Sequence, residues 1–189
     1  MDDFGASLYT NGTFLSNDPA VAAGVHNSLF RGKSLGTFTD AISSEITSGR
    51  FTDLWVGDYF TINSRVYRIA HFDPFYNCGD TALTTHHIAV VPNASMRSAR
   101  MNPSHTTTGG YVGSEIRTTN LATPTNTIKT DFGSSHVLTY RDLLTTTVAS
   151  GQASKSGWYD CCVELMSETM VYGCSVWAKS GHEVGCCSE

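Results

Sequence analysis

The sequence has few charged residues, few basic residues and no long apolar run. Charged residues make up 15% of the 189-residue chain, against about 25% in an average globular protein. With 12 lysines and arginines and a net charge of −5, the chain lacks the basic surface typical of nucleic-acid-binding proteins. No run of about 18 apolar residues is present, so we expect no membrane-spanning helix. The first ten residues, MDDFGASLYT, carry two acids where a secretory signal carries basic residues, which predicts a cytosolic product.

The spacings typical of metal and disulfide sites are also missing. Neither a C-x-x-C nor a His-Glu-x-x-His pattern occurs. Adjacent cysteines on a strand point to opposite faces, which is poor geometry for a shared zinc ion. We therefore predict reduced, partly buried thiols, no metal site and no cofactor. The six cysteines stand at positions 78, 161, 162, 174, 186 and 187.

Hydroxyl and amide side chains supply the polar surface that charged residues do not. Threonine, serine and asparagine are abundant beside 40% hydrophobic residues, a composition that favours strands and tight turns. Asn63-Ser64 separates two apolar segments by two residues, which indicates a β-hairpin. We predict strands at 59–62, 66–69, 85–91, 137–148 and 158–177.

Short helices are predicted between these strands. A helix over 40–48 has Thr39 as its N-cap and Gly49 at its end. Two more are expected farther along, one from Ser114 to about Asn120, and one that starts at Pro124 after a Thr123 cap and stops at Gly133. Residues 1–28 show no sustained apolar period and are interpreted as a polar arm, either loosely ordered or docked on a partner. The predicted fold is one α+β domain with an antiparallel sheet, two or three short helices and an N-terminal arm.

The glycine-rich stretch 108–117, TGGYVGSEIR, has two interpretations. Glycines before a helix can present backbone N–H groups to a phosphate, here those of Ser114 to Ile116. The P-loop lysine and the dinucleotide G-x-G-x-x-G pattern are absent, however. We favour a turn that leads the chain into a helix.

Ionisable residues gather in the segment 71–87 without a recognised spacing. A hydrolase site built from His86 or His87 with Cys78 or Asp80 is one hypothesis, and His71-x-Asp73 belongs to the same group. On a strand, His86 and His87 would point to opposite faces, so at most one would join a site. Pairs such as Cys78–His71, Cys161–His136 and Glu164–Glu168 are the other candidates, and none has the spacing of a known catalytic motif. We predict no catalytic residue.

Aromatic residues are concentrated between Trp55 and Tyr76. Most are expected in the core. Phe75 and Tyr76 lie in a polar loop, and we predict that they form an exposed surface on which a host sugar stacks.

An ordered series of short motifs resembles virion-associated structural proteins of tailed phages and prophages of Gram-positive bacteria. The likeness spans about residues 29–177. Its segments are FRGKSLG at 30–36, GRFTDLWVGDYF at 49–60, THHI at 85–88, MN at 101–102, GGYVGS at 109–114, GSSH at 133–136, WY at 158–159, VELMSE at 163–168 and VYG at 171–173.

The resemblance implies a non-enzymatic part of the virion, assembled in the host cytoplasm and exposed as a head decoration, head fibre or tail-tip module. It implies a C-type-lectin-like domain at 51–189, with residues 1–50 as the attachment side. The implied partners are capsid or tail proteins, further copies of this chain and, in a second interpretation, a host glycan. The Glu-Pro-Asn and Trp-Asn-Asp motifs of calcium-dependent lectins are absent. Relatives commonly continue with Trp-Leu-Arg and Arg-Pro-x-Phe strands, so either the terminal strands of this domain are missing or the last dozen residues take another role.

Overall fold

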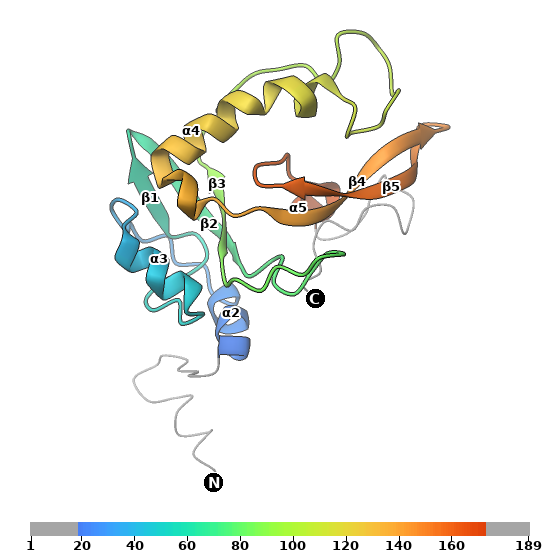
Figure 1. The fold of residues 1–189 in the computed structure, drawn as a ribbon. Coiled ribbons are helices and arrows are strands. Elements are labelled where there is room, and N and C mark those ends of the chain that lie inside the picture. Colours follow the sequence, from blue (N-terminus) through green and yellow to red (C-terminus); the bar gives the residue numbers. More distant parts are fainter. Residues whose placement is uncertain (1–18, 173–189) are drawn as a thin grey trace. The chain divides into compact units, whose positions relative to one another are not determined.

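The computed structural model describes residues 19–172, which divide into two compact units (Figure 1). The first contains the described residues up to Pro74 together with 85–93, and the second contains 75–84 and the described residues from Ala94 onward. Both combine short helices with antiparallel strands, which confirms the α+β prediction. The division does not follow the boundary expected at residue 50. Residues 1–18 of the expected arm lie outside the described residues.

A three-stranded antiparallel sheet forms the centre of the first unit. The strands β1 (Tyr59–Ile62), β2 (Arg65–Phe72) and β3 (Ile88–Pro92) are arranged in that order. Asn63 and Ser64 form the predicted tight turn, with φ angles of 49° and 64°, the left-handed values that a two-residue hairpin turn needs. The third strand starts later than the expected residue 85. The core side chains of this sheet include Phe60, Ile62, Tyr67, Ile69 and Phe72.

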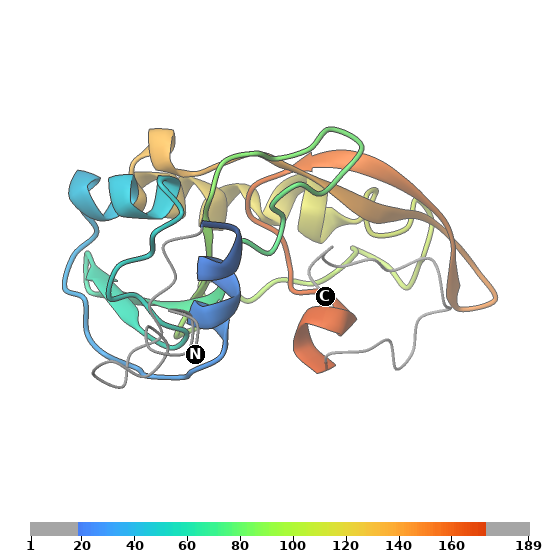
Figure 2. The same cartoon turned by 90° about the horizontal axis from the view of Figure 1, so that it is seen from below.

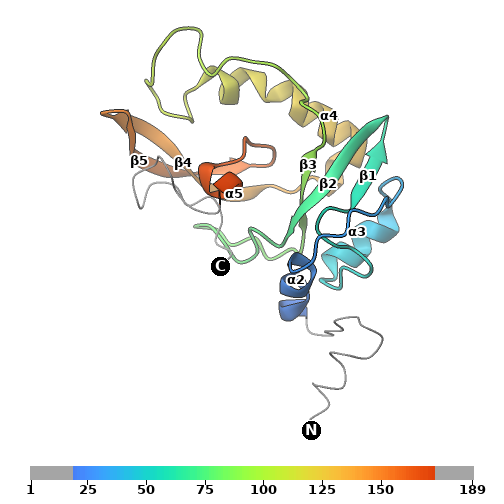
Figure 3. The same ribbon diagram turned by 180° about the vertical axis from the view of Figure 1, so that it is seen from behind.

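Two helices belong to the first unit. The predicted helix is confirmed as α3 (Asp40–Thr47), where Thr39 accepts a hydrogen bond from the Ile42 N–H. It lies beside the β1–β2 hairpin (Figure 3). The helix α2 (Pro19–Asn27) was not predicted, so residues 19–27 of the expected polar arm are helical and not loosely ordered. Residues 30–36 then run along the sheet, with bridges from Phe30 to Val56 and from Ser34 to Tyr59.

A long two-stranded ribbon dominates the second unit (Figure 2). The strands β4 (Tyr140–Ala149) and β5 (Gln152–Cys161) pair along their whole length. Ser150-Gly151 closes the ribbon with φ angles of 53° and 77°. The strand expected at 158–177 therefore starts earlier and ends at Cys161; α5 (Glu168–Tyr172) follows, and residues 173–177 lie outside the described part.

The helices of the second unit differ from the predicted ones at their starts. The π-helix η2 (Ile116–Asn120) leads into α4 (Ala122–Phe132), and the 3-10 turn η3 (Ser134–His136) follows. Gly133 ends α4 as predicted, with φ of 87°. The caps expected from Ser114 and Thr123 are wrong, because Glu115 and Leu121 occupy the cap positions without a side-chain cap bond. None of the described helices combines the length and the apolar character needed to cross a bilayer.

Candidate functional site

The glycine-rich stretch is a turn that packs closely against β4. A Cβ at Gly110 would lie 2.6 Å from the Thr145 carbonyl oxygen, so only glycine allows this approach. The three N–H groups proposed for an anion already donate elsewhere: Ser114 to the Tyr111 carbonyl, Glu115 to the Asn102 side chain and Ile116 to the Met101 carbonyl. The turn interpretation is therefore confirmed, and no N–H group of this set remains for a phosphate.

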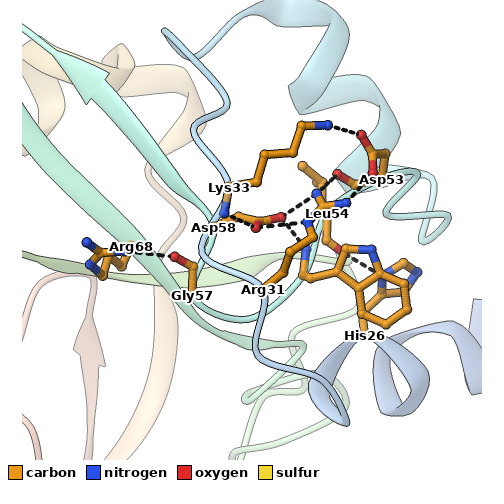
Figure 4. Close-up of polar contacts among 9 residues, drawn as sticks. His26, Arg31, Lys33, Asp53, Leu54, Gly57, Asp58 and Arg68 are labelled. Atoms are coloured by element: carbon orange, nitrogen blue, oxygen red, sulfur yellow. Dashed lines mark hydrogen bonds and ion pairs between the residues drawn. The ribbon is translucent and has the colours of Figure 1, made fainter.

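In the first unit, a fully buried carboxylate holds three segments together. Asp58 accepts hydrogen bonds from Arg31 Nε at 3.1 Å and Nη2 at 2.6 Å, from the Lys33 N–H at 2.8 Å and from the Trp55 N–H at 2.9 Å. Figure 4 shows Arg31 lying between Asp58 and Asp53. A buried charge is tolerated only when it is paired and hydrogen-bonded in this way. We call Arg31, Lys33, Asp53 and Asp58 the arginine clasp.

The outer part of the arginine clasp is exposed to solvent. Asp53 accepts from Arg31 Nη1 and from Lys33 Nζ, and its side chain is 59% exposed. Hydrogen bonds from Arg31 and then Lys33 lower the pKa of Asp53 below its ordinary value. Hydrogen bonding to Asp58 raises the pKa of Arg31. Arg31 and Asp53 are thus charged near neutral pH, and the clasp is suited to holding backbone rather than to transferring protons.

The histidines at 86 and 87 share one carboxylate. Asp73 Oδ2 lies 2.6 Å from His86 Nδ1, and Asp73 Oδ1 accepts from the His87 N–H at 2.7 Å. The prediction that the two point to opposite faces is wrong, because they precede β3 and are not part of a strand. His71 contacts the Phe72 carbonyl and Asn27.

The hydrolase hypothesis needs residues of both units, and it stays a prediction. Asp80 belongs to the second unit, where it accepts from Arg141. Burial lowers the pKa of His87, which favours its neutral form. Within residues 19–172, no group of three or more His, Cys, Asp or Glu side chains is arranged to hold a metal ion.

The cysteine candidates are buried thiols. Cys78 donates to the Tyr76 carbonyl, and Cys161 donates to the Tyr159 carbonyl. Burial raises the pKa of Cys161 to about 12, so almost no thiolate is present near neutral pH.

The exposed aromatic surface is not formed as expected. Phe75 is only 8% exposed, and its ring stacks on Tyr140 with centroids 3.9 Å apart. The exposure predicted for Phe75 is therefore wrong, because the second unit uses this ring in its packing. Tyr76 is half-buried and pairs with Leu83; sugar binding by Tyr76 stays a prediction.

A groove in the second unit is a site that sequence reasoning missed. It has a volume of about 340 Å³. Its lining includes Arg117 of η2, one side of α4 with Thr125 and Asn126, and residues 160–164, which cover the end of β5 and the segment that follows it. The volume falls at the lower end of the ~300–1,000 Å³ range of small-molecule sites. The groove brings a guanidinium, a carboxylate, hydroxyls and an amide together.

Glu164 organises the charged part of this groove. It accepts from the Tyr111 hydroxyl at 2.6 Å and from Arg117 Nε at 3.1 Å, and its side chain is 10% exposed. Burial and the bond to Glu164 raise the pKa of Tyr111, so the phenol remains protonated. Burial also raises the pKa of Asp142 to about 6, with a further contribution from Glu164. Two residues of the groove, Cys161 and Glu164, stand out in the sequence, but as parts of the separate pairs Cys161–His136 and Glu164–Glu168.

Comparison with known proteins gave no further assignment. No family model, curated protein or solved structure matches the chain.

Proposed function

We propose that the chain is a non-enzymatic structural component of a tailed-phage virion, exposed on the capsid surface as a decoration or head-fibre protein. The proposal rests on the ordered series of motifs over residues 29–177. We further propose a C-type-lectin-like relationship for its α+β fold, capsid or tail proteins as partners, and self-association.

The use of the motif residues supports this proposal. Arg31, Lys33, Asp53 and Asp58 of the first two motifs form the arginine clasp. In the second unit, Tyr111 and Glu164 come from motifs 53 positions apart and share one hydrogen bond. Residues of a catalytic motif converge on a substrate, whereas these residues bond to each other and fix backbone. Contacts of this kind are typical of residues that stabilise a fold, and such a fold can present a surface to other proteins.

An exposed apolar pair favours residues 1–50 as the attachment side. Leu29 and Phe30 are 53% and 70% exposed, although one side of the Phe30 ring lies against Gly57. Exposed apolar residues next to each other are typical of protein contacts. Leu29 can be substituted to test attachment without changing the arginine clasp, because it is not part of it.

The experiment is to label purified particles of the phage that encodes this chain with antibodies against residues 94–172, and to locate the label by electron microscopy. Regular labelling on the heads supports the proposal. A parallel test adds the purified chain to particles lacking it; Leu29→Asp should reduce rebinding, whereas Thr119→Asp, an exposed site in the second unit, should not. Unlabelled particles together with recovery of the chain only from the host's soluble fraction would contradict the proposal.

A further inference from the structure

Arg117 lies at the groove with part of its guanidinium unused. Nε donates to Glu164, Nη2 makes a longer 3.4 Å contact with the Asp160 carbonyl, and the guanidinium carbon lies 5.4 Å from the centroid of the Tyr159 ring. Among the described residues, Nη1 has no hydrogen-bond partner. The ion pair and the aromatic ring hold Arg117 in place, and its two remaining N–H groups are available to a ligand.

Neighbouring side chains on α4 are unused as well. The Thr125 hydroxyl and the Asn126 amide line the groove, and within residues 19–172 neither has a side-chain hydrogen bond. Both come from the same side of α4 as Leu121 and Ala122, one turn earlier. The helix therefore offers two donor groups, two acceptor oxygens and a small apolar surface at short spacing.

The charges of the groove nearly cancel. Glu164 is neutralised by Arg117, and Asp160 contributes its backbone carbonyl on this side, since its carboxylate accepts from Arg141 Nη1 at 3.0 Å on the other face of the ribbon. The Glu164 carboxylate disfavours an anion, and its partner Arg117 disfavours a free cation. A ligand that matches this lining must be neutral, and it must both donate and accept hydrogen bonds at neighbouring atoms. Vicinal hydroxyl groups on a C–H-rich ring meet those conditions.

We propose that the groove formed by η2, α4 and residues 160–164 binds a neutral sugar unit of a glycan. Arg117 Nη1 and the Asn126 amide donate to ring hydroxyls, while the Thr125 hydroxyl and the Asn126 carbonyl oxygen accept from them. Leu121 and Ala122 contact the C–H face of the ring. The site is distinct from Phe75 and Tyr76, and it does not rest on the proposed place in the virion.

The test uses the full chain and a panel of neutral sugars: glucose, galactose, N-acetylglucosamine and their disaccharides. Saturation-transfer NMR and calorimetry should detect saturable binding of at least one of them, with a millimolar Kd because the site is small and open. Since the ligand carries no charge, the affinity should change less than about twofold between low and high salt.

Groove variants locate the binding. Ala122→Trp places a large ring in the groove at an exposed position and should abolish binding. Asn126→Ala should weaken binding about threefold to tenfold through the lost hydrogen bonds. Thr130→Trp is the matched control, because it lies on α4 outside the groove and should bind like the original chain. Circular dichroism checks that each variant folds, and Asn126→Ala still tests the site if Ala122→Trp does not.

Three outcomes would overturn the proposal: no panel sugar binds saturably, Ala122→Trp and Asn126→Ala both bind as well as the original chain, or triglycine run in parallel binds the groove in place of sugars. Particle labelling is measured separately, so a failed sugar site and a failed virion assignment are distinguishable.

Discussion

The two units each contain a buried arginine–carboxylate pair, and the pairs differ in what remains unused. In the first unit, Asp58 is fully buried and receives four hydrogen bonds, two of them from backbone N–H groups. In the second, Glu164 accepts two hydrogen bonds, and its partner Arg117 keeps two N–H groups at a groove. The same kind of ion pair holds backbone segments together in the first unit and leaves hydrogen-bond donors at a groove in the second. The two pairs differ in how many of their polar atoms already have hydrogen-bond partners.

The largest expected effect comes from removing the buried acid of the arginine clasp. Asp58→Ala leaves two backbone N–H groups and part of Arg31 without partners, and should cost about 3 kcal/mol of unfolding free energy. Amide hydrogen exchange of β1 and β2 should quicken together, and that of β4 and β5 should not. Unchanged exchange in the β1–β2 hairpin would show that the clasp does not hold the first unit.

In the second unit, the pH dependence of stability tests the role of Asp142. Its pKa is raised to about 6 in the folded chain, so the folded state binds the proton more tightly than the unfolded state. The stability due to this group is therefore present below pH 4 and is lost as pH rises through about 6. Asp142→Asn keeps the bond to the Leu143 N–H and removes the charge, and should stabilise β4–β5 by roughly 2 kcal/mol at pH 7.5.

Urea unfolding followed by far-UV circular dichroism, read at pH 4 and pH 7.5, measures this effect. The gain should vanish at the lower pH. A variant that gains nothing at pH 7.5, or that gains equally at both pH values, would contradict the assignment of the raised pKa to burial.

A substitution at Gly57 tests how the motif at 30–36 packs against the motif at 49–60. Its φ is +86°, and a Cβ there would lie 2.3 Å from the Phe30 ring. Gly57→Ala should destabilise the first unit by about 1–2 kcal/mol through backbone strain and displacement of that ring. Adding Phe30→Ala should recover part of the loss in thermal unfolding, since the clash disappears while the strain stays. Full additivity of the two changes would show that they are not coupled.

The smallest effect is expected at the exposed side of the arginine clasp. Asp53→Ala removes two ion pairs at a position that is 59% exposed, and should cost less than about 1 kcal/mol. High salt should reduce the difference further, whereas the Asp58→Ala effect should persist. Equal salt dependence of both variants would mean that Asp58 is more accessible to solvent than its burial indicates.

Local patterns explain which elements could be predicted from the sequence. Asn63-Ser64 and the Thr39 cap act within a few residues, so the hairpin and α3 are readable in advance. Ser150-Gly151 is a two-residue turn signal of the same kind, and it marks the position of the β4–β5 turn in the sequence. The cap expected from Ser114 failed because its hydroxyl donates backward to Tyr111.

Contacts between distant residues explain what could not be predicted. Arg31 and Asp58 are 27 positions apart, and Arg117 and Glu164 are 47 apart. Neither pair follows from spacing, because each depends on how strands and helices pack. Phe75 shows the same limit: its polar neighbours indicated an exposed loop, and only packing against Tyr140 buries the ring.

The most direct test of the account is the amount of this chain in purified particles. Quantitative mass spectrometry should find it at a constant ratio to the major capsid protein through repeated gradient purification, as expected of a virion component. A ratio that falls toward zero with each purification step would contradict the structural role proposed here.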